Sequence, residues 1–252
     1  MEVRNWSVMH PEQPRQVIRN VSMNVRKGEI VGIAGLMGSG RTEFAMSLFG
    51  RSYGRDIQGE VTLGGGKPDL STVSKAIDAG LAYVTEDRKA LGLILEEPIL
   101  RNVSLANLEG IAKGAVLSRG REQQVAEKYR GAMNIRTPSV FQKVMNLSGG
   151  NQQKVVLSKW LFTQPQVLIL DEPTRGIDVG AKFEIYNIMN DLASQGHGVV
   201  MISSEMPELL GMCDRIYVMN EGRIAGELTR EQASQERIMA LILQDGMKGE
   251  AA

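Results

Sequence analysis

The chain has 252 residues, of which 42% are hydrophobic and 23% charged, a composition typical of a folded globular protein. Lys and Arg number 29, as do Asp and Glu, so the formal net charge is zero, which argues against nucleic acid as a partner. The single cysteine, Cys213, excludes an intrachain disulfide, and no apolar run approaches the roughly 18 residues of a membrane helix. The first residues lack the pattern of a signal peptide, so we expect a chain that works in the cytosol, or at a membrane only through a partner.

The first third of the chain alternates strand-like and helix-like segments. Residues 17–25 alternate apolar and polar side chains, as an early antiparallel strand does. A β-branched run at 29–35 ends in glycine and precedes a helical pattern at 42–50, which predicts a strand, a glycine loop and a helix. Residues 59–65 are expected to form a strand closed by a glycine turn, and 80–86 a buried strand.

The middle of the chain has a different residue pattern from the first third. Residues from about 95 to 146 have a mainly helical pattern, as at 117–135, and we interpret them as a helical insertion in an α/β core. The elements expected after it are a helix at 148–162, a strand at 167–170, a helix at 182–196, a strand at 198–203, a hairpin at 215–228 and an amphipathic helix at 231–243. Strands that alternate with helices predict a mainly parallel sheet with helices on both faces.

Residues 35–42 follow the spacing of a phosphate-binding P-loop, G-x-x-x-x-G-K-[ST], with Arg in place of Lys. Glycines let successive backbone N–H groups converge on phosphate oxygens, and the N-terminus of the following helix adds a partial positive charge. The Thr42 hydroxyl is placed to ligate Mg²⁺. The candidate ATP-binding residues here are Gly35, Gly38, Ser39, Gly40, Arg41, Thr42 and Glu43. This motif alone leaves open a plain glycine turn between a strand and a helix.

An apolar run at 167–170 ends in two carboxylates, Asp171 and Glu172. Asp171, at the carboxyl end of a strand, can hold Mg²⁺ through its water shell, as in P-loop NTPases. Glu172 is then placed to polarise the attacking water as a general base. A strand followed by an acidic turn is common in isolation, but about 130 residues after a P-loop it favours the catalytic interpretation.

Residues 147–154, with the sequence LSGGNQQK, stand before the acidic strand and resemble the LSGGQ signature of ABC ATPases. Ser148 would cap a helix, and the Gly149 and Gly150 amides could approach a γ-phosphate closely. The resemblance implies that this loop serves the nucleotide held by the opposite domain of a head-to-tail dimer. In isolation the same residues could be a plain Ser-capped helix start.

The resemblance covers the chain from about residue 3 to 244. In detail the chain is similar to the second nucleotide-binding half of sugar-importing ABC ATPases, whose motifs match here at 38–43, 83–89, 147–154, 171–182 and 203–209. It implies the P-loop NTPase fold of ABC ATPases, an α/β fold with a mainly parallel core sheet, an antiparallel β subdomain and an inserted helical subdomain.

The resemblance also implies a division of the chain. Residues 1–94 would form the N-terminal part of the ATP-binding core with the P-loop, 95–163 the helical subdomain with the signature loop, and 164–252 the C-terminal part of the core with the acidic and switch strands. Because no first nucleotide domain precedes Met1, we expect the chain to be a fragment of a longer protein.

By the same resemblance, the expected function is ATP hydrolysis that energises import of a monosaccharide such as xylose, galactose or ribose. The implied cofactors are ATP and Mg²⁺. The implied partners are a second nucleotide-binding domain, a transmembrane permease and, indirectly, a periplasmic sugar-binding protein, with the chain at the inner face of the cell membrane. The alternatives are a non-transport ABC ATPase, against which the neutral charge argues, and a regulatory module that holds nucleotide with little turnover.

Three positions depart from the pattern that the family carries at a competent site. Arg41 replaces the P-loop lysine, Glu86 the Q-loop glutamine, which senses Mg²⁺ and water, and Ser204 the switch histidine. Arg keeps the charge but not the compact ammonium geometry, Glu86 can still contact the metal, and a serine cannot carry the charge of an imidazole. We therefore expect a chain whose own site is degenerate and slow, and whose signature loop completes a faster site on a partner domain.

Three further features are open to two interpretations. His10, with Trp6 nearby, stands where related domains stack an aromatic ring on adenine, but either could be a loop residue or a buried anchor. Asp178 belongs to a D-loop match and could equally be the N-cap of the next helix. Residues 87–100 resemble the surface that faces the transporter's coupling helix, or an ordinary solvated loop.

Overall fold

A computed structural model describes residues 1–249. The chain forms two compact units. The core unit comprises Met1–Tyr83, Gln166–Glu172 and the residues from Met189 onward, and the helical unit comprises Val84–Pro165 and Pro173–Ile188. The division into 1–94, 95–163 and 164–252 stays a prediction.

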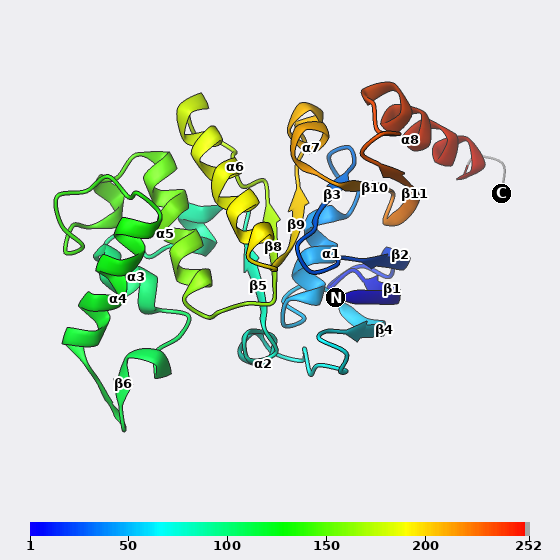
Figure 1. Ribbon diagram of the computed structural model, residues 1–252. Coiled ribbons are helices and arrows are strands. Elements are labelled where there is room, and N and C mark those ends of the chain that lie inside the picture. The colour runs from blue at the N-terminus through cyan, green and yellow to red at the C-terminus, as the bar shows by residue number, and fades with distance from the viewer. Residues whose placement is uncertain (250–252) are drawn as a thin grey trace. The chain divides into compact units, whose positions relative to one another are not determined.

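The core unit is built on a six-stranded sheet in the order β11-β10-β3-β9-β8-β5 (Figure 1). Its strands are β3 (Ile30–Ala34), β5 (Leu81–Val84), β8 (Val167–Asp171), β9 (Gly198–Ile202), β10 (Arg215–Asn220) and β11 (Arg223–Thr229). β10, β3, β9 and β8 pair in parallel, whereas β11 returns antiparallel to β10. Every residue of β3, β8 and β9 is buried, as the continuous apolar runs predict for a sheet covered on both faces.

A second, antiparallel sheet in the core unit has the order β2-β1-β4, from β1 (Glu2–Met9), β2 (Gln16–Asn24) and β4 (Arg55–Thr62). This sheet confirms the expected antiparallel subdomain and the strand at 17–25. The strand expected at 59–65 begins earlier, at Arg55, and the glycine turn expected to close it is present. The strand stops at Thr62 because Gly64 and Gly65 adopt positive φ angles of 60° and 86°, which turn the chain back on itself.

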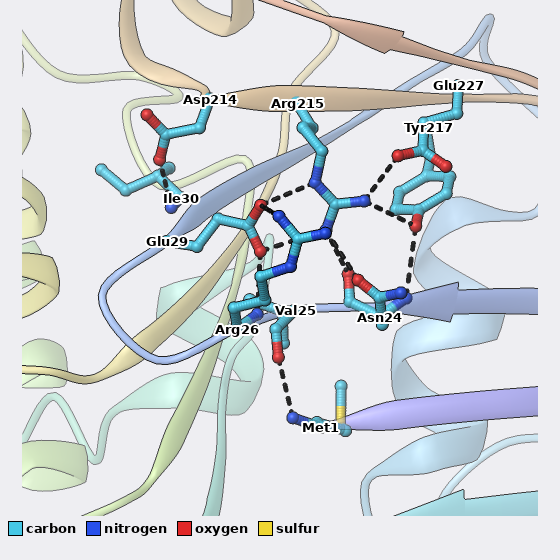
Figure 2. Close-up of polar contacts among 10 residues, drawn as sticks. All are labelled: Met1, Asn24, Val25, Arg26, Glu29, Ile30, Asp214, Arg215, Tyr217 and Glu227. Carbon is cyan, nitrogen blue, oxygen red and sulfur yellow. Dashed lines mark hydrogen bonds and ion pairs between the residues drawn. The ribbon is translucent and has the colours of Figure 1, made fainter.

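The two sheets are joined by a hydrogen-bonded network around Arg215 of β10 (Figure 2). Its guanidinium contacts both oxygens of Glu29 at 2.6 and 3.0 Å and the Glu227 carboxylate at 2.5 Å. It also donates to the Asn24 side-chain oxygen at 2.7 Å and to the Tyr217 hydroxyl at 3.1 Å. Because all these acceptors are engaged, a buried charge is compensated and the end of β2 is fixed against β10.

The helices of the core unit are α1 (Arg41–Leu48), α2 (Val73–Asp78), α7 (Met206–Met212) and α8 (Gln235–Gly249), with the later part of α6 (Val179–Ser194). α7 packs against β3, and α8 packs against β10 and β11. α1 follows β3 after the glycine loop, as expected. Among residues 1–249, none of the helices combines the length and the hydrophobicity that crossing a bilayer requires.

The helical unit contains α3 (Ile99–Ser104), α4 (Arg119–Ala132), α5 (Gly149–Leu161) and the first part of α6. A hairpin of two-residue strands, β6 (Ala112–Lys113) with β7 (Val116–Leu117), a π-helix at Arg88–Gly92 and 3-10 helices at Glu109–Ile111 and Val144–Asn146 complete it. α3 packs against both α4 and α5. The prediction of mainly helical structure over 95–146 was therefore too simple, because turns and this hairpin interrupt the helices.

Candidate functional site

The phosphate loop connects β3 to α1 in the core unit, and its glycines are required by the backbone. Gly38 and Gly40 have φ angles of 79° and 99°, in the left-handed region that side chains disfavour. A Cβ atom on Gly35 would lie 2.5 Å from both the Met219 carbonyl oxygen and the Ser39 hydroxyl. The loop therefore has a fixed, tight path whose N–H groups precede the N-terminus of α1.

Asp171 lies at the carboxyl end of β8 with 1% of its surface exposed. The Tyr83 hydroxyl donates a hydrogen bond to its Oδ2 at 2.9 Å. Burial raises the pKa of Asp171 to about 6, and hydrogen bonds from the Thr42 and Tyr83 side chains oppose this rise. Oδ1 is buried and has no hydrogen-bond partner among the described residues. One oxygen of the carboxylate is thus fixed, and the other is left for a ligand.

Glu172 follows directly, with a φ angle of 47° in the left-handed region. Such a conformation is strained for a side chain other than glycine, and it is held by a hydrogen bond from the Glu172 N–H to the Ile202 carbonyl at 2.9 Å. Burial raises the pKa of the Glu172 carboxyl, while hydrogen bonds from the side chain and backbone of Ser204 and the charge of Arg41 counter it. The serine at the switch position is therefore in contact with the candidate base.

Arg41, the first residue of α1, is buried at 8% exposure. Its Nη1 donates to the Ser203 carbonyl at 2.7 Å, and its Nη2 lies 3.9 Å from Glu172 Oε1. Burial lowers the pKa of the guanidinium, and the nearby carboxylates of Glu172, Asp171 and Glu43 raise it. The guanidinium is thus directed at the candidate base and at the residue after β9. Glu43, half-buried in the first turn of α1, adds negative charge beside it.

These residues fit a magnesium-bound nucleoside triphosphate. Asp171 Oδ1 and Ser39 Oγ are buried polar atoms without a hydrogen-bond partner among the described residues, and such atoms are costly unless a ligand satisfies them. A carboxylate and a hydroxyl, here those of Asp171 and Thr42, are ligands that Mg²⁺ prefers. The hydrogen bond between the two side chains places both at one point in the core unit.

The signature loop lies in the helical unit, where Ser148 is the N-cap of α5 and accepts the Asn151 N–H. Of the two glycines that follow, Gly150 is required by packing and Gly149 is closely packed. A Cβ on Gly149 would lie 2.8 Å from Arg88 Nη2, and one on Gly150 would lie 2.4 Å from the Ala181 Cβ. Residues Gly149 and Gly150 therefore sit against the turn before α6, whose Asp178 caps that helix by accepting the Ala181 N–H at 2.9 Å.

Glu86 also lies in the helical unit, where its carboxylate forms an ion pair with Arg175. Two residues later, Arg88 donates to the carbonyls of Arg175 at 2.9 Å and Gly176 at 3.4 Å. The Q-loop segment is therefore tied to the D-loop by two arginines. Sequence reasoning missed both, and also missed Tyr83, because their partners are distant in sequence or are backbone atoms, which a motif does not reveal.

The two aromatic candidates near the N-terminus, Trp6 and His10, differ in burial and in their hydrogen bonds. Trp6 is 4% exposed, and its Nε1 donates to the Ser47 hydroxyl at 2.9 Å, so it is a buried anchor and not a platform for adenine. His10 is half-buried, accepts the Glu12 and Gln13 N–H groups through Nδ1, and meets the Tyr53 ring edge to face at 6.3 Å. His10 stays a candidate.

The core unit thus joins a phosphate loop, a candidate metal ligand at a strand end, a candidate base and a candidate switch residue, the arrangement of a P-loop nucleotide-binding domain. A family model described as "ABC transporter" matches residues 18–175, so the chain belongs to the ABC transporter family. It is 61% identical over 242 residues to the L-arabinose transport ATP-binding protein AraG of Geobacillus stearothermophilus, covering 96% of this chain and 47% of that protein. It is 54% identical over 239 residues to the xylose import ATP-binding protein XylG of Thermoanaerobacter pseudethanolicus, covering 94% and 47%. The chain therefore spans about half the length of the curated relatives it matches.

Solved structures with the same fold include the dimeric ATP-binding cassette MJ0796 bound to ADP and Pi, with a TM-score of 0.76 and 22% identity over 91% of this chain and 98% of that one. Another is the ADP conformation of MJ1267, an ATP-binding cassette of an ABC transporter, with a TM-score of 0.77 and 20% identity over 96% and 99%. These likenesses confirm the expected fold class: an α/β domain with a mainly parallel core sheet and a separate antiparallel subdomain.

Proposed function

We propose that this chain is the ATP-binding and ATP-hydrolysing domain of an ABC importer that energises monosaccharide uptake through a transmembrane permease. The observation that carries the proposal is the buried Asp171 Oδ1, which lies beside Thr42 and has no hydrogen-bond partner within residues 1–249, in a chain whose relatives are named for arabinose, xylose and ribose transport. The domain would lie at the inner face of the cell membrane by way of the permease, pair with a second nucleotide-binding domain, and depend indirectly on a periplasmic sugar-binding protein. Nucleic acid is not among the proposed partners.

The residues have distinct roles in this proposal. The N–H groups of residues 35–42 and the Ser39 hydroxyl bind the phosphate chain of ATP, and His10 lies against the base. Thr42 and Asp171 hold Mg²⁺, with Glu86 as a further ligand. Bound Mg²⁺ would supply positive charge that offsets the negative charge of the phosphate oxygens. Glu172 orients the attacking water and accepts its proton.

The site on this chain is proposed to turn over slowly. The Arg41 guanidinium donates to the Ser203 carbonyl and faces Glu172, so it already contacts protein groups and is less available to a phosphate. The charge of Arg41 favours the ionised form of Glu172, and Ser204 supplies hydrogen bonds to Glu172 without the charge of an imidazole. Ser148, Gly149 and Gly150 then complete a faster site on the partner domain. A module that holds nucleotide with little turnover is the second candidate, favoured by the same Arg41 contacts.

The permease is proposed to dock on the helical unit at residues 87–100. The exposed apolar side chains Leu91, Ile94 and Met145 occur on two segments held together, since the Met145 N–H donates to the Leu95 carbonyl at 3.0 Å. Leu91 is 65% exposed and Ile94 47%. Exposed apolar side chains that form a contiguous patch mark protein contacts, and the proposal requires that these three contribute to one.

Calorimetry with Mg-ATP tests the binding step. Thr42→Ala should weaken the affinity at least about tenfold, since a ligand to the metal is lost. Thr72→Ala removes a hydroxyl from the start of α2 and is the matched control, with unchanged affinity expected. No binding heat from the folded chain, or equal affinities for both variants and the wild type, would contradict the proposal.

Turnover and transport are tested in the assembled importer in proteoliposomes. Glu172→Gln is compared with the corresponding change in the partner domain, and uptake of arabinose, xylose and ribose is measured. We expect the partner-domain change to abolish most ATP hydrolysis and the Glu172 change to remove the smaller share. Equal losses would refute the asymmetry, and turnover unaffected by Glu172→Gln would favour the nucleotide-holding module.

A further inference from the structure

The hydroxyl of Ser148 is held by a single residue, Asn151. It accepts two hydrogen bonds from that residue, one from the side-chain Nδ2 at 2.9 Å and one from the backbone N–H at 3.4 Å. The other end of the same amide, Asn151 Oδ1, accepts the backbone N–H of Arg136 at 2.9 Å. All three residues belong to the helical unit.

The orientation of the Asn151 amide follows from its partners. A backbone N–H can only donate, so the atom that faces Arg136 must be the oxygen, and the nitrogen must face Ser148. A serine hydroxyl has two acceptor lone pairs and one hydrogen. Because both lone pairs are directed at Asn151, the hydrogen of Ser148 is left to point away from it.

The position of Arg136 is itself fixed. Its Nη2 lies 3.0 Å from Glu184 of α6, and the same carboxylate pairs at 2.5 Å with Lys154, whose side chain is 2% exposed. Lys154 also donates to the Asn134 carbonyl at 2.9 Å. The backbone that orients Asn151 is thus anchored to α5 and α6 on both sides.

A pocket beside Ser148 can hold an acceptor for its hydroxyl hydrogen. Ser148 is exposed and lines a pocket of about 130 Å³ together with Gly150 and Asn151. These residues lie at the N-terminus of α5, where backbone N–H groups favour an anion, and the pocket is also lined by Arg136 and by the carboxylates of Asp178 and Glu184. A hydroxyl held as a donor selects an acceptor, such as a phosphate oxygen, over another donor.

We propose that Asn151 is a positioning residue that fixes the Ser148 hydroxyl as a hydrogen-bond donor toward the phosphate presented by the partner domain. This inference rests on the proposed role of the signature loop in completing the partner's site. Asn151 makes no contact with the nucleotide in this proposal; it acts through Ser148.

The test uses the full chain with a partner nucleotide-binding domain whose own general base is replaced by Gln, so that ATP-driven association can be measured without hydrolysis. Asn151→Asp keeps the acceptor for Arg136 and replaces the donor to Ser148 by a carboxylate oxygen, toward which the hydroxyl would turn. The expected result is an association Kd about 10- to 100-fold weaker, the loss of one hydrogen bond to a charged group. The thermal midpoint of the chain alone should not change, because the fold keeps its hydrogen bond to Arg136.

Two controls separate this role from the added charge. Asn146→Asp places a carboxylate on an exposed residue two positions before Ser148 and should leave the Kd within about twofold of wild type, as expected for a surface charge. In a Ser148→Ala background, Asn151→Asp should cost little further, since residues that act through one another are not additive.

The outcomes are distinguishable. If Ser148→Ala leaves the association unchanged, the proposed role of the signature loop fails and this inference with it. If Ser148→Ala weakens the association while Asn151→Asp does not, only the positioning role is overturned. An Asn146→Asp loss equal to that of Asn151→Asp, or a full additional loss in the Ser148→Ala background, would assign the effect to charge and overturn the inference.

Discussion

The folding stability of the Asp171→Asn variant, relative to that of the wild type, should increase with pH in the ligand-free chain. Asp171 is buried, and burial raises its pKa from the ordinary 3.8 to about 6. The folded state therefore binds this proton more tightly than the unfolded state. The stability contributed by the group is fully present below about pH 4 and is lost as the pH rises through about 6. A difference of about two pKa units corresponds to about 3 kcal/mol.

The variant lacks this pH-dependent loss. Any constant cost of burying an amide cancels when two pH values are compared, so the stability of Asp171→Asn relative to wild type should rise by about 3 kcal/mol between about pH 4 and pH 7.5. Asp191→Asn, on an exposed position of α6, is the matched control and should show no comparable rise.

Urea unfolding in the presence of EDTA measures this difference. The chain has two tryptophans, Trp6 in the core unit and Trp160 in the helical unit. In a Trp160→Phe background, the fluorescence of the buried Trp6 reports the unit that holds Asp171. A relative stability that does not change with pH, or that falls as the pH rises, would refute the assignment of a desolvated carboxylate. The same variant should lose the stabilisation that Mg-ATP gives the wild type.

Three further predictions follow from packing and hydrogen bonds. Tyr83→Phe frees the Asp171 carboxylate, the proposed metal ligand, to rotate. It should raise the Mg²⁺ concentration needed for half-maximal ATP binding about 10-fold, while saturating Mg²⁺ restores binding; a titration of unchanged midpoint would contradict this role. Arg215→Met removes both charged hydrogen bonds to the buried Glu29, which keeps only the Arg26 N–H at 2.8 Å and the Arg26 guanidinium at 3.9 Å, and should cost about 3 kcal/mol of unfolding free energy, which the double change with Glu29→Gln partly recovers. Gly150→Ala should destabilise the chain by about 1 to 3 kcal/mol in urea unfolding, because its methyl would overlap the Ala181 Cβ; a neutral result would show that α5 and α6 can separate.

The sequence predicted the core sheet well because its strands are buried on both faces. β3 and β8 are short apolar runs that end beside Gly35 and at Asp171, and β9 is a short apolar run that begins at Gly198. Their order along the chain matches the alternation of strands and helices. Such runs are determined by local composition. The fold class and the family could therefore be named from motifs alone.

What the sequence could not show depends on contacts between distant segments. β1 was not predicted because its apolar pattern is irregular, and its register shifts several times as it pairs with β2 and β4. The roles of Tyr83 and Arg88 were also missed, since one bonds a residue 88 positions later and the other bonds backbone carbonyls 87 and 88 positions later. No local pattern encodes such partners.

The buried polar groups of the core unit support the proposal that this site binds Mg-ATP but hydrolyses it slowly. Asp171 Oδ1 and Ser39 Oγ have no hydrogen-bond partner among the described residues, so a ligand that satisfies them is favoured. Arg41, in contrast, already donates to Ser203 and faces Glu172, so moving its guanidinium to a phosphate would cost those contacts. The proposed function therefore combines affinity for Mg-ATP with weak stabilisation of the transition state. A domain of this kind is useful to a transporter if nucleotide held here closes the pair of domains and the signature loop, with its Ser148 donor, promotes hydrolysis at the partner's site.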